Sequence, residues 1–386
     1  MVGLHKHDQA EDTTMPNLQL FLHIKNLLTT LHEEDEPHLS TLALMVTGLF
    51  FGRHVQLWMI ALWCPWEVQL LSVVRRFERF VADERVDIHR IFEPFVWAMQ
   101  ASLGNETAYL IIDCTQAGPK CRALVIGLAY HGTILPLRWR TVKGKKGHLK
   151  GQIQQELLAE VWPYFRGHRR VVVLGDAEFS NEPVINWLRQ VGWDFVFRFQ
   201  HRYQLRLTPD SEWQTAKTIY QQAGLKSGQV QHWQPTAYTE AHAIPRLTMT
   251  VHWDKDEEEP LCLISTLAPQ EAPECVYQMR FWIETLFGQQ KSRGFALDRT
   301  QMTTPEHIDR LLLAVAIASC LTLGLGTHLV IIQRTKQVDR SDRRDLSLFQ
   351  LGWRYLFRLL ALNRLTDIKI RFSWQFQLPP SGFQSA

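Results

Sequence analysis

The sequence lacks the cysteine pattern of a zinc protein or of a disulfide-bonded secreted domain. Its 386 residues include only 6 cysteines, which form no C-x-x-C pair and no cluster with histidine at zinc-ligand spacing. Cys114 and Cys262 lie in or beside apolar runs and are interpreted as small core residues. We therefore expect reduced thiols, as in the cytoplasm, and no structural zinc site.

The sequence also lacks a strong excess of either charge. It contains 42 Lys and Arg against 39 Asp and Glu, a formal net charge of +3, so the whole chain does not have the charge of an obvious nucleic-acid binder. The charge is unevenly distributed, however. Residues 334–371 hold ten Lys and Arg against four Asp and Glu. This basic region is compatible with phosphate binding and equally with a solvated helix face.

Signal-peptide features are missing, and there is only one long apolar run. Met1 to Pro16 is polar and acidic, without an apolar core. Residues 311–332 form a run of 22 residues without Lys, Arg, Asp or Glu, which is long enough to span a membrane. Because this run contains Gly324, Gly326 and His328, we favour a helix buried against a sheet and no membrane partner. The glycines predict a break near residue 325. A single-span membrane protein is the alternative.

The most informative segment contains four polar residues with the spacing Y-x2-R-x3-E-x6-K, namely Tyr277, Arg280, Glu284 and Lys291. At about 100° per residue, they would fall within roughly a 60° arc of one α-helix. A carboxylate beside a phenol and two cations is typical of a metal ligand next to a phosphate backbone. An ordinary amphipathic helix with an Arg280–Glu284 ion pair is the alternative.

Two aspartates follow short apolar runs earlier in the chain. Residues 108–112 are apolar and rich in β-branched side chains, and they end at Asp113. Residues 171–174 form a similar run, which leads to Asp176. Both runs predict buried strands, and a carboxylate past a strand end is well placed for a site at a sheet edge. One such aspartate would be interpreted as a turn or cap, but two together with Glu284 predict a shared site.

These residues resemble a known family. Asp113, Asp176 and Glu284 resemble the DDE triad of bacterial cut-and-paste transposases, and the Y-x2-R-x3-E-x6-K spacing is the signature of insertion-sequence family four. Residues 131–139 resemble the second and third strands of that family's ribonuclease-H-like core. The resemblance covers roughly residues 100–330.

The resemblance implies an α/β fold, with a ribonuclease-H-like mixed sheet flanked by helices, interrupted by a β-rich insertion, and helical N- and C-terminal regions. The chain patterns agree, with helices expected near 152–165 and 182–191 and a strand at 195–199. The expected regions are a helical N-terminal DNA-binding region (1–104), the first part of the catalytic core (105–200), the insertion (201–269), the second part of the core (270–332) and a basic C-terminal region (333–386).

The N-terminal region contains a helical segment, residues 72–81, in which Arg75, Arg76 and Arg79 accompany apolar Phe77 and Phe80. Such a segment fits recognition of the element's terminal inverted repeats, as the resemblance implies. A packed helical cap without DNA contact is an equal alternative.

The resemblance further implies metal-dependent DNA cleavage at the ends of an insertion sequence and strand transfer into target DNA. Two Mg²⁺ ions would be bound, for which Mn²⁺ can substitute, with Asp113 bridging both and Asp176 and Glu284 each holding one. Tyr277, Arg280 and Lys291 would contact DNA, Arg280 and Lys291 gripping phosphates near the scissile bond.

The implied partners are the terminal inverted repeats and the target DNA, with a homodimer in the synaptic complex and a location at the nucleoid of a bacterial cytoplasm. Two further alternatives are a related ribonuclease-H-like DNA endonuclease and a catalytically silent DNA-binding regulator.

Overall fold

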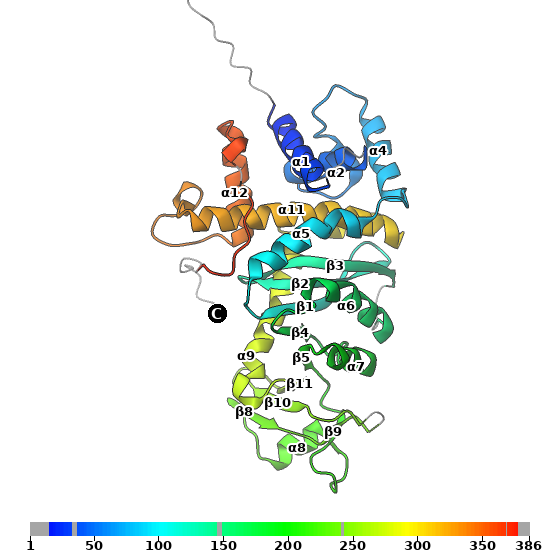
Figure 1. Ribbon diagram of the computed structural model, residues 1–386, viewed down its shortest axis with the longest axis vertical. Helices are drawn as coiled ribbons and strands as arrows, with labels where there is room; N and C mark the ends of the chain where they lie inside the picture. Colours follow the sequence, from blue (N-terminus) through cyan, green and yellow to red (C-terminus); the bar gives the residue numbers. More distant parts are fainter. Residues whose placement is uncertain (1–14, 33–36, 145–148, 241–242, 368, 377–386) are drawn as a thin grey trace, which may run out of the picture.

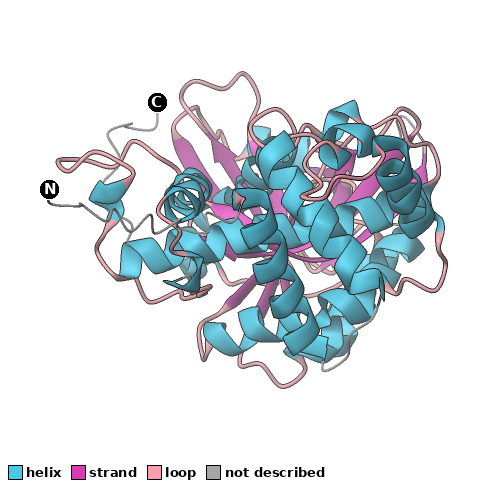
Figure 2. Cartoon of the chain, turned by 90° about the horizontal axis from the view of Figure 1, so that it is seen from above, coloured by secondary structure: helices cyan, strands magenta, loops and turns pink. Residues whose placement is uncertain are grey.

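A computed structural model describes residues 15–32, 37–144, 149–240, 243–367 and 369–376 (Figure 1). The ends of the predicted N- and C-terminal regions, residues 1–14 and 377–386, lie outside the described residues. The strands of the main sheet follow one another along the long axis of the molecule, with the N-terminal helices beyond one end (Figure 1). Seen from above, the strands lie among helices (Figure 2).

The N-terminal region is helical, as predicted. Its helices are α1 (Pro16–His32), α2 (Pro37–Gly52), α3 (Leu57–Ala61), α4 (Leu70–Ala82) and α5 (Ile88–Leu103). In α4, Phe77 and Phe80 are buried at 0% and 3% exposure, whereas Arg75 and Arg79 are exposed. Arg76 is half-buried, and its Nε donates to Thr41 Oγ1 at 2.9 Å. Arg75 and Arg79 are therefore the two arginines of this segment that face solvent.

The first part of the core alternates strands and helices. Its elements are β1 (Ala108–Gln116), β2 (Cys121–Tyr130), β3 (Thr133–Lys143), α6 (Gly151–Phe165), β4 (Val171–Gly175), α7 (Glu182–Val191) and β5 (Asp194–Arg198). The predicted helices near 152–165 and 182–191 are confirmed, and so is the strand near 195–199, one residue earlier. Residues 131–139 hold the turn after β2 and most of β3. The left-handed φ angles of His131 (44°) and Gly132 (84°) form this hairpin turn.

The main sheet has eight strands in the order β3-β2-β1-β4-β5-β11-β10-β8. Strands β1, β2 and β3 are antiparallel, whereas β4 and β5 run parallel to β1. This order and direction of the first five strands is the ribonuclease-H-like arrangement, and the predicted fold class is confirmed. All five residues of β4 are buried, as expected for a parallel strand covered on both faces.

Residues 201–269 are β-rich, but they do not form a separate body. Strands β8 (Gln229–Trp233), β10 (Thr248–Trp253) and β11 (Leu261–Ser265) extend the main sheet, with β11 antiparallel to β5. The remaining elements, a small sheet and one helix, are β6 (Gln204–Arg206), β7 (Gln214–Thr215), α8 (Ala216–Gln222) and β9 (Ala237–Tyr238).

The second part of the core returns to helices. Its elements are η1 (Pro269–Glu271), α9 (Pro273–Tyr277), η2 (Gln278–Phe281), α10 (Trp282–Gln290), η3 (Leu297–Arg299) and α11 (Pro305–Ile331). The C-terminal region adds η4 (Thr335–Gln337), α12 (Leu348–Ala361) and η5 (Leu365–Asp367).

Helix α11 is the long apolar segment of the sequence. By length and composition it could cross a membrane, but 94% of its most apolar window is buried inside the protein. It packs against β3, α2, α5 and α12, which confirms the prediction of a buried helix. The predicted break near residue 325 is wrong, because the helix runs without interruption through Gly324 and Gly326. Gly326 instead allows close packing, since a Cβ there would meet the backbone of Leu348 at the start of α12.

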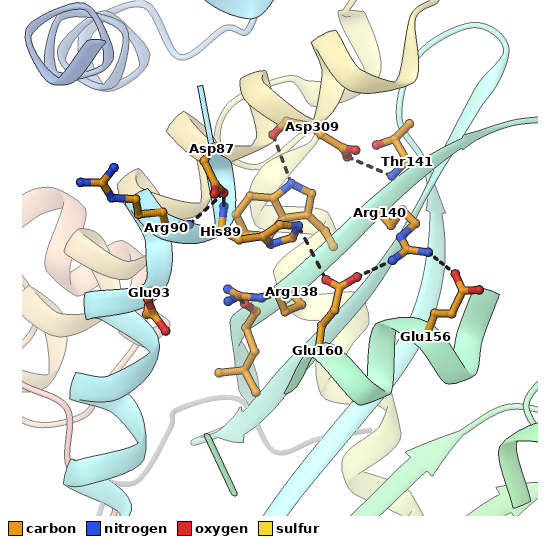
Figure 3. Close-up of polar contacts among 12 residues, drawn as sticks. Asp87, His89, Arg90, Glu93, Arg138, Arg140, Thr141, Glu156, Glu160 and Asp309 are labelled. Atoms are coloured by element: carbon orange, nitrogen blue, oxygen red, sulfur yellow. Dashed lines mark hydrogen bonds and ion pairs between the residues drawn. The ribbon is translucent and has the colours of Figure 1, made fainter. Parts of the chain in front are cut away.

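A polar network joins helix α5 to the sheet through α6, because His89 Nε2 of α5 lies 3.6 Å from Glu160 Oε2 (Figure 3). Asp87 caps α5 by accepting hydrogen bonds from the backbone amides of His89 and Arg90 at 2.9 and 3.0 Å. On β3, Arg140 pairs with Glu160 of α6 and with Glu156 at 2.7 Å.

Asp309 connects α11 to the same strand. Its carboxylate accepts the backbone amide of Thr141 at 2.9 Å, and its carbonyl oxygen accepts Trp139 Nε1 at 3.1 Å (Figure 3). Helices α5 and α11 are thus held to the sheet by directed contacts as well as by apolar packing.

Gly352→Ala should destabilise the fold, because the added Cβ would overlap the backbone carbonyl of Thr322 where α12 crosses α11. We expect the overlap to cost about 1–3 kcal/mol. Gly324→Ala is the matched control, since its Cβ meets the end of the Ile370 side chain, which can move. Urea unfolding of both variants measures the difference, and equal free energies of unfolding would contradict this account of the crossing.

Candidate active site

The parallel pairing of β1 with β4 brings two aspartates together. Its last residue pair joins Ile111 to Leu174. Asp113 and Asp176 each lie two residues beyond this pair, at the same level of the sheet. The prediction that Asp113 follows the end of its strand is wrong, because antiparallel pairing with β2 extends β1 to Gln116. Asp113 therefore projects from a strand that continues beyond the end of β4.

The segment from Tyr277 to Lys291 is not one α-helix, contrary to the prediction. Tyr277 ends α9, Arg280 lies in the 3₁₀ turn η2, and Glu284 lies in α10. Lys291 follows the last residue of α10 and has non-helical φ and ψ angles of −95° and −121°. A 3₁₀ turn keeps residues three apart on the same side, and Arg280 pairs with Glu284 one turn later, but Lys291 lies beyond the helical residues. Tertiary contacts with β1 then bring Arg280 and Lys291 to Asp113 and Thr115.

The Arg280 guanidinium lies among all three candidate carboxylates. Its Nη1 is 2.6 Å from Glu284 Oε1, and its Nη2 is 2.9 Å from Asp113 Oδ2 and 3.9 Å from Asp176 Oδ2. The side chains of Arg280 and Asp113 are only 11% and 13% exposed, whereas that of Glu284 is 58% exposed. The structure thus gathers the predicted triad from β1, the end of β4 and α10 around one cation.

Backbone amides orient the two aspartates. Asp113 Oδ1 accepts a hydrogen bond from the amide of Cys114 at 2.7 Å, and Asp176 Oδ1 accepts one from the amide of Glu178 at 2.9 Å. In each aspartate, the other oxygen, Oδ2, faces Arg280. Burial raises the pKa of Asp113 to about 6, although the nearby Arg280 charge opposes this shift.

Lys291 approaches the same strand from the far end of α10. Its Nζ donates to Thr115 Oγ1 at 2.5 Å. Thr115 is buried and lies two residues after Asp113, on the same face of β1. Burial lowers the pKa of Lys291. A second cation therefore lies beside the strand that carries Asp113.

Tyr277 is part of the core. It is 2% exposed, and its ring meets that of Phe281 edge to face, with the ring centroids 6.1 Å apart. Burial raises the pKa of its phenol to about 12. Tyr277 thus supports the turn that carries Arg280, and its contact with DNA stays a prediction.

The donor chemistry of this cluster fits a hard divalent cation. Asp113, Asp176 and Glu284 offer carboxylate oxygens, the ligands that Mg²⁺ prefers. Across the described ranges, no three His, Cys, Asp or Glu side chains are already arranged as a metal site. In this structure Arg280 lies among these oxygens and supplies the positive charge that they share.

A protein-family profile described as "Transposase DDE domain" matches residues 109–321, more than half of the chain. The chain belongs to this family. It is a DDE transposase, an enzyme that acts on DNA, and transposases of this family generally use divalent metal ions. The matched range begins in β1 and ends in α11, so it contains all three carboxylates.

No curated protein sequence matches the transposase significantly. Among solved structures, it is similar to a piggyBac transposase synaptic complex with hairpin DNA, at 10% identity and a TM-score of 0.44, over 92% of this chain and 81% of that one. It is also similar to Ciona intestinalis Endonuclease V in complex with DNA, at 11% identity and a TM-score of 0.27, over 44% of this chain and 76% of that one.

Sequence reasoning assigned no role to Glu178, which the structure places beside the site. Its amide orients Asp176, and its carboxylate Oε2 lies 3.9 Å from Arg122 Nη2. The Glu178 charge also contributes to the raised pKa of Asp113. An acidic residue two positions after a strand-end aspartate was the available signal, but a turn explains the same pattern.

Arg280→Gln should destabilise the transposase in a pH-dependent way when no divalent ion is added. The pKa of Asp113 is raised in the folded state, so the protonated carboxyl group stabilises the fold below about pH 4. This stabilisation is lost as the pH rises through about 6. Without Arg280, the Asp113 pKa should rise further. The variant should therefore lose about 1–3 kcal/mol at pH 8 and much less at pH 5.

Chemical unfolding at both pH values and an NMR titration of the Asp113 carboxyl group measure these effects. Arg299→Gln is the control, because Arg299 and Asp298 form an exposed pair at 3.7 Å, which should contribute little. An Arg280→Gln variant with the same loss at both pH values would contradict the coupling of Arg280 to Asp113.

Proposed function

We propose that this transposase belongs to insertion-sequence family four and moves its element by a cut-and-paste reaction. It would cleave DNA at both element ends and join them to target DNA. The observation that carries this proposal is the convergence of Asp113, Asp176 and Glu284 on the Arg280 guanidinium. The Y-x2-R-x3-E-x6-K spacing supports the assignment to family four.

Asp113, Asp176 and Glu284 would hold two Mg²⁺ ions, or Mn²⁺ in their place, with Asp113 shared between them. When bound, these ions stabilise the attacking and leaving oxygens of an in-line displacement at phosphorus. The amides of Cys114 and Glu178 orient the two aspartates, so that one oxygen of each remains directed toward the shared site. Glu284, the most exposed of the three, approaches from the solvent side.

Arg280 and Lys291 would bind phosphates beside the scissile bond. Both are cations without acceptor atoms, and both lie within contact distance of groups on β1. The planar Arg280 fork matches two phosphate oxygens, whereas Lys291 acts as a point charge. Tyr277 would contribute through its phenol to the same DNA contact.

Water would be the nucleophile for cleavage, and the freed 3′-hydroxyl would be the nucleophile for strand transfer. The cluster consists of carboxylates and cations, and the buried phenol of Tyr277 holds its proton because of its raised pKa. We therefore propose no covalent bond between protein and DNA.

The N-terminal region would recognise the terminal inverted repeats. The exposed Arg75 and Arg79 of α4, one helical turn apart, offer two cations for the DNA backbone. Two protomers, one for each element end, would form the synaptic complex, at the nucleoid of a bacterial cytoplasm. Short inverted repeats in the DNA on both sides of the gene would support this assignment, and their absence would count against it.

Cleavage should require a divalent cation. We expect the purified transposase to nick linear DNA carrying its own element ends when Mg²⁺ or Mn²⁺ is present, because the three carboxylates otherwise repel the phosphate. Gel analysis of end-labelled DNA measures the nicks. Equal cleavage in excess chelator would exclude this mechanism.

Asp113→Asn, Asp176→Asn and Glu284→Gln should each abolish cleavage while DNA-end binding persists. Each change removes a metal-binding charge and preserves the size of the side chain. Cleavage and gel-shift assays on the same preparations separate chemistry from binding. Asp210→Asn, an exposed carboxylate in the insertion, is the control and should cleave normally. Substantial cleavage by any of the three variants would overturn the assignment of that residue.

A further inference from the structure

A row of arginines leads away from the carboxylates along the surface. It begins at Arg293, whose Nη2 donates to the carbonyl oxygen of Thr285 at 3.4 Å, next to Glu284 in the sequence. The Nη2 of Arg53 then donates to the carbonyl oxygen of Arg293 at 3.3 Å. Through these contacts, the residue after α2 lies beside the turn that follows the active-site helix α10.

Helix α12 continues this row with aromatic rings and two more arginines. The Arg53 guanidinium carbon lies 5.3 Å from the Trp353 ring centroid. Trp353 in turn stacks on Phe357, with their centroids 6.0 Å apart. Arg354 and Arg358 follow these rings directly in sequence and are both exposed. We call this set the arginine–aromatic track, which consists of Arg53, Arg293, Arg354, Arg358, Trp353 and Phe357.

Within the part of the chain that the structure describes, the charges of the track have no acidic partner. Among the residues that the structure describes, none of the four guanidinium groups lies within 4.0 Å of a carboxylate oxygen. The preceding loop differs, because Arg340 pairs with Asp342 at 3.1 Å and Arg343 with Asp345 at 2.8 Å. Among the described residues, the basic C-terminal region therefore contains a loop with paired charges and a helix whose two arginines have no carboxylate partner, although Arg354 Nη1 donates to the carbonyl oxygen of Val338 at 3.2 Å.

The arrangement of these arginines suits a phosphate backbone. Arg354 and Arg358 lie one helical turn, about 6 Å, apart along α12. Arg53 stacks its flat face on Trp353, which leaves guanidinium edges available as donors. Exposed arginines without carboxylate partners attract a polyanion and release its condensed counterions on binding.

We propose that the arginine–aromatic track binds the backbone of the DNA duplex that runs into the active site. The inference rests on the transposase function proposed above, because that function supplies DNA at the carboxylates. The track joins the N-terminal region, the catalytic core and α12 into one surface. A duplex lying on it would be held without regard to sequence, since guanidinium–phosphate contacts carry no base information.

The test measures binding of the full-length protein to a labelled DNA duplex of arbitrary sequence, in chelator and over a range of salt concentrations. For the double variant Arg354→Gln with Arg358→Gln, we expect the log–log salt slope to fall by about two, with roughly tenfold weaker affinity near physiological salt. The double lysine variant should keep most of the slope, because it keeps both charges.

Arg166→Gln is the matched control. Arg166 is exposed and lies 5.1 Å from the ring centroid of Trp162, so it resembles Arg53 chemically. It precedes β4, at the end of that strand opposite Asp176. This variant should bind DNA like the wild type. If the melting temperature of the double variant falls below that of the wild type, Arg358→Gln alone should still lower the log–log salt slope by about one.

The outcomes separate this inference from the proposed function. If the wild type binds DNA and the glutamine variants keep the salt slope and affinity of the wild type, the track is not a DNA surface. This holds whether or not the oligomeric state of the variants changes. The proposed function then stands. An equal loss in the lysine and glutamine double variants would also overturn the inference, since charge would not be the cause. If the wild-type protein does not bind DNA, the proposed function itself is overturned.

Discussion

Four residue pairs between β1 and β4 fix the geometry on which the active site depends. Residues 108–111 and 171–174 are almost entirely buried and apolar, so their register is set by the burial of side chains on both faces of the sheet. A shift of one residue would exchange the faces of a whole strand. Because Asp113 and Asp176 each lie two residues past the last pair, this register alone places them side by side.

Arg280 then compensates the negative charges of the carboxylates that this geometry brings together. Burial of Asp113 makes an isolated negative charge costly, which is the main cause of its raised pKa. Arg280 offsets this cost from another element, and the same guanidinium positions Glu284 at 2.6 Å. The triad therefore depends on the turn at η2, whose packing in turn depends on buried Tyr277.

The surrounding elements make this region part of a larger sheet. The β-rich insertion continues the main sheet through β11, so residues between Asp176 and Glu284 extend the core that carries them. At the other end of the sheet, α11 covers β3, and Asp309 bonds to that strand. Residues from the N- and C-terminal regions consequently meet beside α10, where Arg53 contacts both Arg293 and Trp353.

The sequence by itself determined the fold class and the elements of the first half of the core. The apolar, β-branched run at 171–174 predicted a buried strand, and the pattern in 152–165 predicted a helix. The three carboxylates were found because Asp, Asp and Glu follow a known pattern with Tyr277, Arg280 and Lys291. Local periodicity is enough to assign strands and helices, since it reflects which side chains must avoid water, whereas the fold class and the triad were implied by the family resemblance.

Only the tertiary structure decided how these parts meet. It placed Asp113 within a strand, because the partner strand β2 extends beyond β4. It replaced the expected single helix by α9, η2 and α10, and it kept α11 intact through Gly324 and Gly326. At Gly326, close packing on α12 compensates for the low helix propensity of glycine. It also showed which arginines of the basic C-terminal region are already paired. These features depend on contacts between residues far apart in sequence, whose energies no local pattern contains.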